Sequence, residues 1–248
     1  MCLLNRIERF SRTVKLIGEE AFKRLESSKV AVFGIGGVGS YVVEALARAG
    51  VGEFLLIDGD YIVESNINRQ IHALESSLGK SKVETMKARA LDINPNAKVQ
   101  TMHAYFPFEM NWDSGYDYVI DAVDDVSAKI EIIINSKSRG IPVISSMGAG
   151  NKLHPEMFRI ADIYDTKVCP LARVMRRELR ARGIEDVKVV YSEETPVEVQ
   201  KALGNGMSDC FEKNAPGSLG KEAPGSVSFV PAAAGLIIAG EVIRTLCK

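Results

Sequence analysis

The 248-residue sequence lacks an excess of charge of either sign and lacks a long apolar run. Its 31 lysines and arginines balance 32 aspartates and glutamates, so no overall basic field draws the chain to nucleic acid, and any such contact requires a local patch. The longest uncharged apolar stretch, residues 226–240, is shorter than the roughly 20 residues that span a membrane. We interpret it as a buried strand and helix and expect no membrane association.

Cysteine and histidine are also scarce. No Cys-x-x-Cys pair is present, which excludes a four-cysteine zinc site, and the histidines show no metal-ligand spacing. With no recognisable secretory leader, this usage favours a reducing cytoplasm. The 21 glycines and nine prolines are an ordinary share, which excludes collagen-like and low-complexity chains. The cysteines are Cys2, Cys169, Cys210 and Cys247, and the histidines are His72, His103 and His154.

Apolar strands alternate with helical patterns along most of the chain. Two short helices divided at Gly18 are predicted within residues 5–25. Strands are predicted at 30–33, 54–57, 99–104, 118–121, 142–146, 158–162 and 187–191, and longer helices at 41–49, 80–91, 126–139, 171–182 and 232–246. This alternation predicts a doubly wound, mostly parallel α/β sheet of the Rossmann type. We expect one domain over 1–248, made of N-terminal helices (1–28), a nucleotide-binding core (29–150) and a substrate-side extension (151–248).

The first predicted strand runs directly into a glycine-rich segment, GIGGVG at residues 34–39, and a helix follows. Asp58 ends the next predicted strand. A strand, glycine turn, helix and distant carboxylate form the dinucleotide-binding fingerprint, in which glycines let the backbone approach phosphate and the carboxylate accepts the ribose hydroxyls. We therefore expect nucleotide contacts from Gly34, Gly36, Gly37, Gly39 and Asp58.

The loop after the second strand favours ATP over a nicotinamide. It holds Asn66, Arg69 and Gln70, and Lys80 and Lys82 begin the following predicted helix. A nucleotidyl transferase must neutralise its β,γ-phosphate leaving group, whereas a dehydrogenase does not need cations there. A nicotinamide-binding oxidoreductase or redox sensor remains the alternative.

An acidic segment, DAVDD at residues 121–125, lies where another parallel strand ends. Ligands bind at this edge of doubly wound sheets, and Mg²⁺ prefers carboxylate and phosphate oxygens. Asp125 immediately precedes a predicted helix and is expected to cap it, whereas Asp124 is the predicted metal ligand.

These motifs together resemble the ubiquitin-activating-enzyme-like superfamily, the ThiF, MoeB and HesA adenylating enzymes. The resemblance is carried by residues 9–12, 34–39, 58–60, 65–70, 79–82 and 121–125. It implies a ribose contact from Asp58, triphosphate contacts from Arg69 and Lys82 with support from Asn66 and Gln70, Mg²⁺ bound by Asp124, and catalytic roles for Arg69, Lys82 and Asp124. Arg12 matches the arginine that reaches into the partner's nucleotide site, which implies a homodimer and a catalytic role for Arg12.

The superfamily's common reaction joins a carboxylate to the α-phosphate of ATP and releases pyrophosphate. Sulfur-carrier activators in it typically hold two Cys-x-x-Cys pairs, which this chain lacks. Residues 169–180 (CPLARVMRRELR), 187–196 and 226–235 instead resemble the tRNA threonylcarbamoyladenosine dehydratase branch. This implies adenylation of the threonyl carboxylate on tRNA, followed by ring closure through an internal nitrogen with loss of AMP. Adenylation of the C-terminus of a ubiquitin-like sulfur carrier is the first alternative, and docking of a sulfur-transfer protein is left open.

The helix predicted at 171–182 carries an arginine stripe. At 100° per residue, its four spaced arginines share one face, opposite Leu171, Val174, Met175 and Leu179. Arginine pairs well with phosphate, so we expect tRNA contacts from Arg173, Arg176, Arg177 and Arg180. Cys210 lies in a glycine-rich loop, residues 203–226, but ring closure requires no thioester, so a catalytic role for Cys210 is not assigned.

Overall fold

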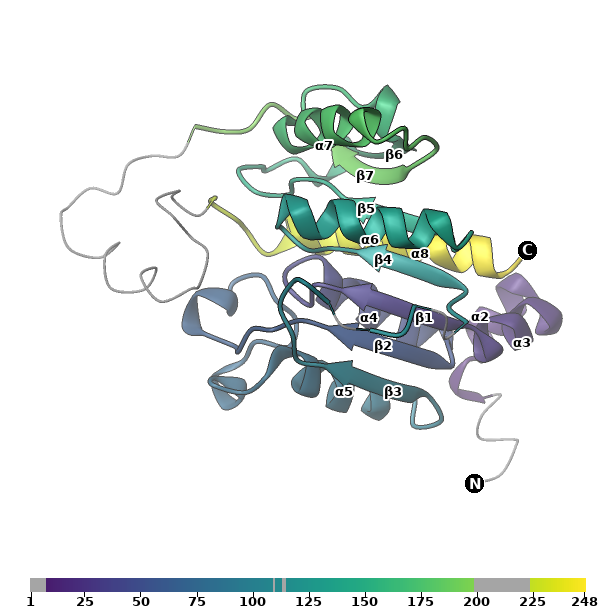
Figure 1. Ribbon diagram of the computed structural model, residues 1–248. Coiled ribbons are helices and arrows are strands. Elements are labelled where there is room, and N and C mark those ends of the chain that lie inside the picture. The colour runs from purple at the N-terminus through teal and green to yellow at the C-terminus, as the bar shows by residue number, and fades with distance from the viewer. Residues whose placement is uncertain (1–7, 109, 113–114, 199–223) are drawn as a thin grey trace.

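The computed structural model describes residues 8–108, 110–112, 115–198 and 224–248, which form a sheet with helices on both faces (Figure 1). Seven strands of this described part form one sheet in the order β3-β2-β1-β4-β5-β7-β6. Neighbouring strands are parallel except β6 and β7, which are antiparallel. The predicted doubly wound, mostly parallel sheet is therefore confirmed.

Most elements form close to their predicted bounds. The strands are β1 (Lys29–Phe33), β2 (Glu53–Ile57), β3 (Lys98–Met102), β4 (Tyr118–Asp121), β5 (Val143–Ser146), β6 (Phe158–Asp162) and β7 (Lys188–Ser192). The α-helices are α2 (Ser11–Ile17), α3 (Glu19–Ser27), α4 (Gly39–Ala49), α5 (Lys82–Ile93), α6 (Val126–Ser138), α7 (Pro170–Ala181) and α8 (Phe229–Leu246). Short 3-10 turns are η1 (Glu64–Asn66), η2 (Glu75–Ser77), η3 (Pro155–Met157) and η4 (Ile163–Asp165).

Three differences from the predicted bounds bear on the site. β3 ends at Met102, two residues earlier than predicted, so the following residues leave the sheet. α5 begins at Lys82, so Lys80 precedes the helix. The strand expected within 226–240 does not form. Helix α8 begins at Phe229, earlier than predicted, and contains Pro231 in its first turn, where a helix tolerates proline.

Two apolar cores lie on opposite faces of the sheet because successive strand side chains alternate in direction. Val30 and Val32 of β1 pack in the core that α4, α5 and α8 cover. Ala31 and Phe33 of the same strand pack in the core that α6 and α7 cover. Figure 1 shows α4 and α6 on the two sides of the sheet. Strands buried on both faces explain their continuous apolar sequences.

The C-terminal helix α8 returns to the core that α4 and α5 cover. A Cβ at Gly235 would lie 2.5 Å from the Val38 carbonyl oxygen, so only glycine allows α8 to approach α4 this closely. By length and composition α8 is apolar enough to cross a membrane. Its apolar residues Val230, Ala234 and Ile238 are buried in the core that contains α4.

A fully buried ion pair joins β4 to α6. Lys129 Nζ lies 3.1 Å from Asp121 Oδ2, and both side chains have zero exposure. Lys129 also donates to the Ser146 carbonyl oxygen at 2.7 Å, and the Ser145 hydroxyl donates to Asp121. Every charge in this cluster is therefore compensated, which makes removal of a single partner costly.

We predict that Lys129→Met lowers the free energy of unfolding by about 3–5 kcal/mol, because Asp121 would be left buried without its counter-charge. Urea unfolding followed by circular dichroism measures this change. Lys137→Met, on the same helix, is the control because Lys137 is only partly buried and donates to the Asp186 carbonyl oxygen; it is expected to change stability by less than about 0.5 kcal/mol. Equal effects of the two substitutions would contradict the assignment.

His72 is buried in the loop that follows η1, and within the described chain neither ring nitrogen has a hydrogen-bond partner. Burial, together with the charges of Lys82 and Arg89, lowers the pKa of His72 from 6.5 to about 4. The folded state therefore holds the neutral ring. Its contribution to stability is fully present above pH 6.5 and is lost as the pH falls toward 4.

We predict that His72→Leu flattens the fall of the melting temperature between about pH 7 and about pH 5, because the variant has no imidazole to protonate on unfolding. Thermal melts at a series of pH values measure this. His154→Gln, a substitution of an exposed histidine, is expected to keep the wild-type pH dependence. An unchanged slope in His72→Leu would refute the prediction.

Candidate functional site

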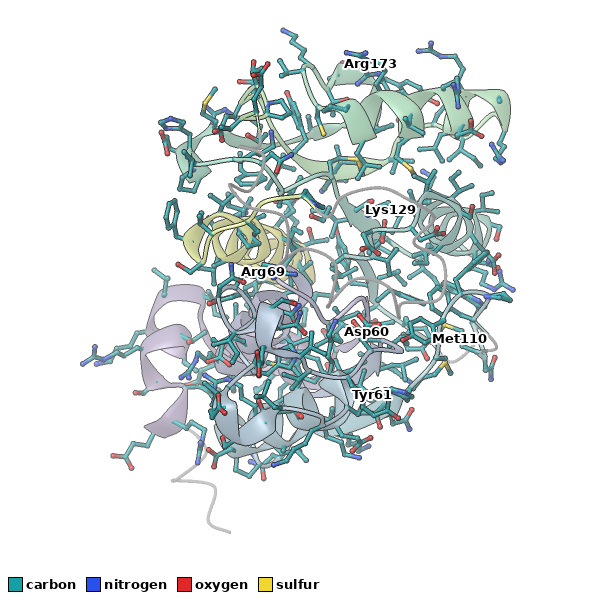
Figure 2. The ribbon with its side chains drawn as sticks, turned by 90° about the vertical axis from the view of Figure 1, so that its left-hand side faces the viewer. Asp60, Tyr61, Arg69, Met110, Lys129 and Arg173 are labelled. Carbon is teal, nitrogen blue, oxygen red and sulfur yellow. The ribbon has the colours of Figure 1, made fainter. Side chains whose placement is uncertain are left out.

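A cleft of about 460 Å³ opens where β1, β2 and β4 end. Figure 2 views the molecule toward this edge, with Asp60 and Arg69 near the centre. Almost all residues that the sequence assigned to nucleotide binding line this cleft. They are Gly34, Gly36, Gly37, Asp58, Asn66, Arg69, Gln70, Lys82 and Asp124.

The glycine turn forms the floor of the cleft. Gly34 has a φ of 82°, and a Cβ there would lie 2.6 Å from the Ala122 carbonyl oxygen. Gly39 is not among the lining residues; a Cβ on it would lie 1.8 Å from the Gly34 carbonyl oxygen, so it serves packing. The amides of Gly36, Gly37 and Val38 have no acceptor within the described chain, so they are available to an anion at the start of α4.

Asp58 is fixed at the end of β2 by main-chain amides. Its two carboxylate oxygens accept from the amides of Ile35 at 2.6 Å and Asp60 at 2.8 Å. Burial raises the pKa of Asp58, and the charge of Lys82 and the two amides oppose this increase. The carboxylate is thereby held at the cleft with a defined direction, as a ribose contact requires.

The loop around η1 brings the guanidinium group of Arg69 and the side-chain amides of Asn66 and Gln70 to the cleft. Arg69 Nη1 donates to the Ser65 carbonyl oxygen at 2.5 Å, and burial lowers the pKa of Arg69. Asn66 is buried, and its side-chain oxygen accepts from the Val63 amide at 3.2 Å, so it holds the loop. The side-chain oxygen of Gln70 is buried without a partner in the described chain, which fits a ligand group in the cleft.

Lys82 forms an ion pair with Asp60 in the cleft. Its side chain is 7% exposed, and Nζ lies 2.6 Å from Asp60 Oδ2. The hydroxyl of Tyr105 donates to Asp60 Oδ1 at 2.9 Å. Burial raises the pKa of Asp60, but Lys82, Tyr105 and His103 together outweigh this and leave the pKa lowered. Partial burial and the hydrogen bond to Asp60 raise the pKa of Tyr105 to about 12.

Sequence reasoning included Asp60 only as part of a family motif and missed Tyr105. Tyr105, Phe106 and Phe108 line the cleft because β3 ends early and the chain turns over the end of β2. The sequence signal was the aromatic run at 105–108, directly after an apparent strand.

Asp125 of the acidic segment caps a helix, as predicted. Asp125 caps α6, with its carboxylate accepting from the Ala128 amide at 2.7 Å. Asp124 is exposed and lines the cleft. Within the described residues no group of three or more acidic, histidine or cysteine side chains forms a metal cage. A carboxylate beside a phosphate-binding turn nevertheless suits Mg²⁺, which keeps several waters and takes few protein ligands.

One predicted residue, Arg12, lies outside the cleft of this chain. It is on α2 and is exposed. Cys210 and most of the 203–226 loop lie outside the described residues. The end of that loop is described: Pro224 and Ser226 line the cleft, and the Ser226 carbonyl oxygen accepts from Asn68 at 3.0 Å. Cys169 and Cys247 are free thiols.

The arginine stripe forms on α7 and its members differ in their contacts. Arg176 donates to the Thr166 carbonyl oxygen at 2.9 Å, and Arg180 lies 5.1 Å over the ring centre of Tyr164. Arg177 pairs with the neighbouring Glu178 at 2.9 Å. Arg173 is exposed and lies at the upper edge of the molecule in Figure 2, apart from Arg69 near the centre.

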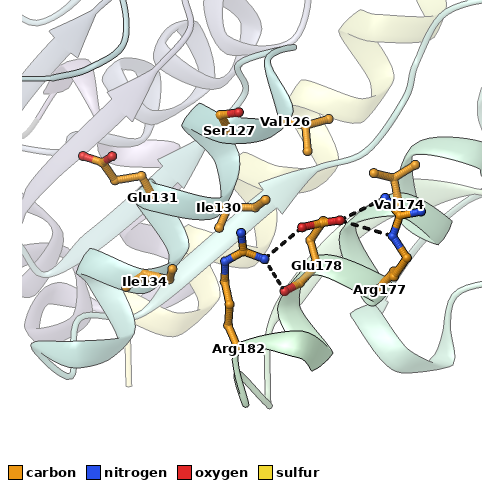
Figure 3. Close-up of a pocket in the computed structure, with 9 residues that line it drawn as sticks. All are labelled: Val126, Ser127, Ile130, Glu131, Ile134, Val174, Arg177, Glu178 and Arg182. Atoms are coloured by element: carbon orange, nitrogen blue, oxygen red, sulfur yellow. Dashed lines mark hydrogen bonds and ion pairs between the residues drawn. The ribbon is translucent and has the colours of Figure 1, made fainter.

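A shallow groove separates α7 from α6 (Figure 3). Glu178 binds both Arg177 and Arg182 along this groove. Val174, which helical periodicity assigned to the buried side, is 36% exposed because it lies at the groove's edge.

Comparison with known proteins accounts for this arrangement. A family model described as the ThiF family matches residues 10–248. A tRNA threonylcarbamoyladenosine dehydratase of Bacillus subtilis is 44% identical over 98% of this chain and 96% of that protein. One of Haemophilus influenzae is 43% identical over 70% of this chain and 67% of that protein.

Solved structures give the same result. The Escherichia coli tRNA N6-threonylcarbamoyladenosine dehydratase, TcdA, in complex with AMP superimposes with a TM-score of 0.81 and 31% identity, covering 97% of this chain and 94% of that one. The complex with ATP gives a TM-score of 0.80 at the same identity and coverage. The chain therefore belongs to the ThiF family, in which it groups with the tRNA threonylcarbamoyladenosine dehydratases.

Proposed function

We propose that this protein uses ATP to dehydrate threonylcarbamoyladenosine in tRNA to its cyclic form. The observation that carries the proposal is a single cleft lined by a glycine turn, a ribose-type carboxylate, two cations and an exposed carboxylate. The relatives named for this activity are similar over nearly the whole chain, which supports the choice of substrate.

Each residue has a chemical role in this proposal. The open amides of the glycine turn bind phosphate, and Asp58 accepts the ribose hydroxyls. Arg69 and Lys82 neutralise the negative charge that develops on departing pyrophosphate, with Asn66 and Gln70 holding the loop and facing the cleft. Mg²⁺, bound through Asp124, supplies further neutralisation of the phosphates.

The proposed reaction has two chemical steps, adenylation and ring closure. The threonyl carboxylate attacks the α-phosphorus, forming an acyl adenylate as pyrophosphate leaves. An internal nitrogen then attacks the activated carbonyl carbon, loses its proton, and AMP departs, so the nucleoside becomes lighter by one water. No protein thiol is needed in either step.

The proposal extends to assembly and compartment. The exposed position of Arg12, outside this chain's own cleft, is consistent with its use in the cleft of a second copy of the chain, which makes a homodimer the working unit. Free cysteines agree with a reducing cytoplasm. Docking of a sulfur-transfer protein stays open. The oxidoreductase alternative gains no support from the family, and activation of a sulfur-carrier protein is an outcome of the first test below.

We predict that, in the presence of Mg²⁺, the protein releases pyrophosphate from ATP only when tRNA that carries threonylcarbamoyladenosine is added. A pyrophosphate assay with modified and unmodified tRNA, with mass analysis of the nucleosides, checks this. The expected product is lighter by one water. Release without tRNA but with a Gly-Gly-tailed small protein would instead establish the sulfur-carrier alternative.

We predict that Arg69→Ala and Asp124→Ala each lower turnover on the order of 10²-fold, because each removes charge neutralisation at the phosphates. Single-turnover rates at saturating ATP and tRNA measure the loss. Asp92→Ala is the matched comparison, because it removes an exposed carboxylate of α5 that is not among the residues lining the cleft, and it is expected to keep turnover. Normal turnover in both test variants would end this assignment of roles.

We predict that the double variant Arg173→Gln/Arg177→Gln weakens tRNA binding. The slope of the logarithm of the binding constant against the logarithm of the salt concentration is expected to become shallower by about one unit for each phosphate that is no longer neutralised. Filter binding at several salt concentrations measures both. ATP binding is expected to stay unchanged, and Arg48→Gln, on the opposite face of the sheet, is the control for loss of an arginine away from α7. An unaltered salt slope in the double variant would exclude α7 from the RNA interface.

A further inference from the structure

Asp60 lies between the side chains of Lys82 and Tyr105 and is hydrogen-bonded to both. One of its carboxylate oxygens accepts from Lys82 Nζ at 2.6 Å, and the other accepts from the Tyr105 hydroxyl at 2.9 Å. Both oxygens are therefore engaged and the carboxylate cannot rotate without breaking a contact. All three side chains line the cleft.

Tyr105 is itself fixed by a close backbone contact. Its ring lies over Gly59, where an added Cβ would be 2.7 Å from ring atoms. The ring therefore packs directly on the backbone between Asp58 and Asp60. Tyr105 is 57% exposed, so burial alone does not hold it, and the hydrogen bond to Asp60 fixes the direction of its hydroxyl.

Lys82 needs such a restraint. A lysine ammonium is a compact charge on a flexible four-carbon stem, and it has three donors in place of a rigid fork. The bond to Asp60 uses one donor and holds the ammonium at the cleft. The remaining donors are left for the distal phosphates of a bound nucleoside triphosphate.

We infer that Tyr105 is a positioning residue that acts through Asp60 to hold Lys82 against the β- and γ-phosphates, so that this relay favours ATP over AMP. The inference rests on the proposed use of ATP. AMP lacks the phosphates that Lys82 would meet, so a defect in the relay weakens ATP binding selectively. Loss of general packing in the cleft would weaken both nucleotides alike.

The test is equilibrium binding of ATP and of AMP to the full chain without tRNA, by calorimetry. We predict that Tyr105→Phe, which keeps the ring over Gly59, weakens ATP binding about fivefold, as expected for one lost hydrogen bond, and AMP binding less than twofold. Tyr61→Phe is the matched control: Tyr61 is also exposed, its ring contacts that of His103 at a tilt with 4.8 Å between ring centres, and the substitution is expected to change neither affinity.

A double-variant cycle separates the relay from independent effects. Asp60→Asn is expected to cost more ATP affinity than Tyr105→Phe, and adding Tyr105→Phe to it is expected to cost little more, because the relay is already broken. Additive losses, or equal losses for ATP and AMP, would overturn the inference. Failure of the wild-type protein to bind ATP at all would instead count against the proposed function.

Discussion

The close approach of three backbone segments at residues 34, 39 and 122 is the constraint on which the site depends. Gly34 lies against Ala122, and Gly39 lies against the Gly34 carbonyl oxygen, with no room for a Cβ at either glycine. β1 lies between β2 and β4, so the chain order of the strands reverses at this point of the sheet. A doubly wound sheet opens a crevice where the order reverses, and the cleft lined by the glycine turn lies there.

Two lysine–aspartate ion pairs lie at and below this cleft. Lys82 is paired with Asp60, and below the cleft Lys129 is paired with Asp121 in the core. The two pairs differ in kind. The Lys129 pair is fully buried and joins elements, whereas Asp60 is half-exposed, so its lysine borders space that a ligand can occupy.

The C-terminal segment completes the site in two ways. Pro231 of α8 lies next to Gly37, so the roof over the glycine turn comes from a segment almost 200 residues later in the sequence. β7 and β6 extend the sheet beyond β5, and α7, which carries the arginines, packs in the core on one face of the sheet. The cleft and a separate basic helix thus lie on one scaffold.

The sequence by itself determined the strand and helix order, the glycine turn, and the assignment of Asp58, Arg69 and Lys82 to one site, because these follow from local patterning and spacing. Only the tertiary structure decided that Tyr105 and Asp60 restrain Lys82, and that Gly39 packs without lining the cleft. The contacts of Lys82 and Tyr105 with Asp60 join segments that are distant along the chain, so their geometry depends on how the loops fold over the sheet edge. Gly39 packs against the nearby Gly34, but whether it lines the cleft depends on the folded shape of the turn, and no local pattern encodes it.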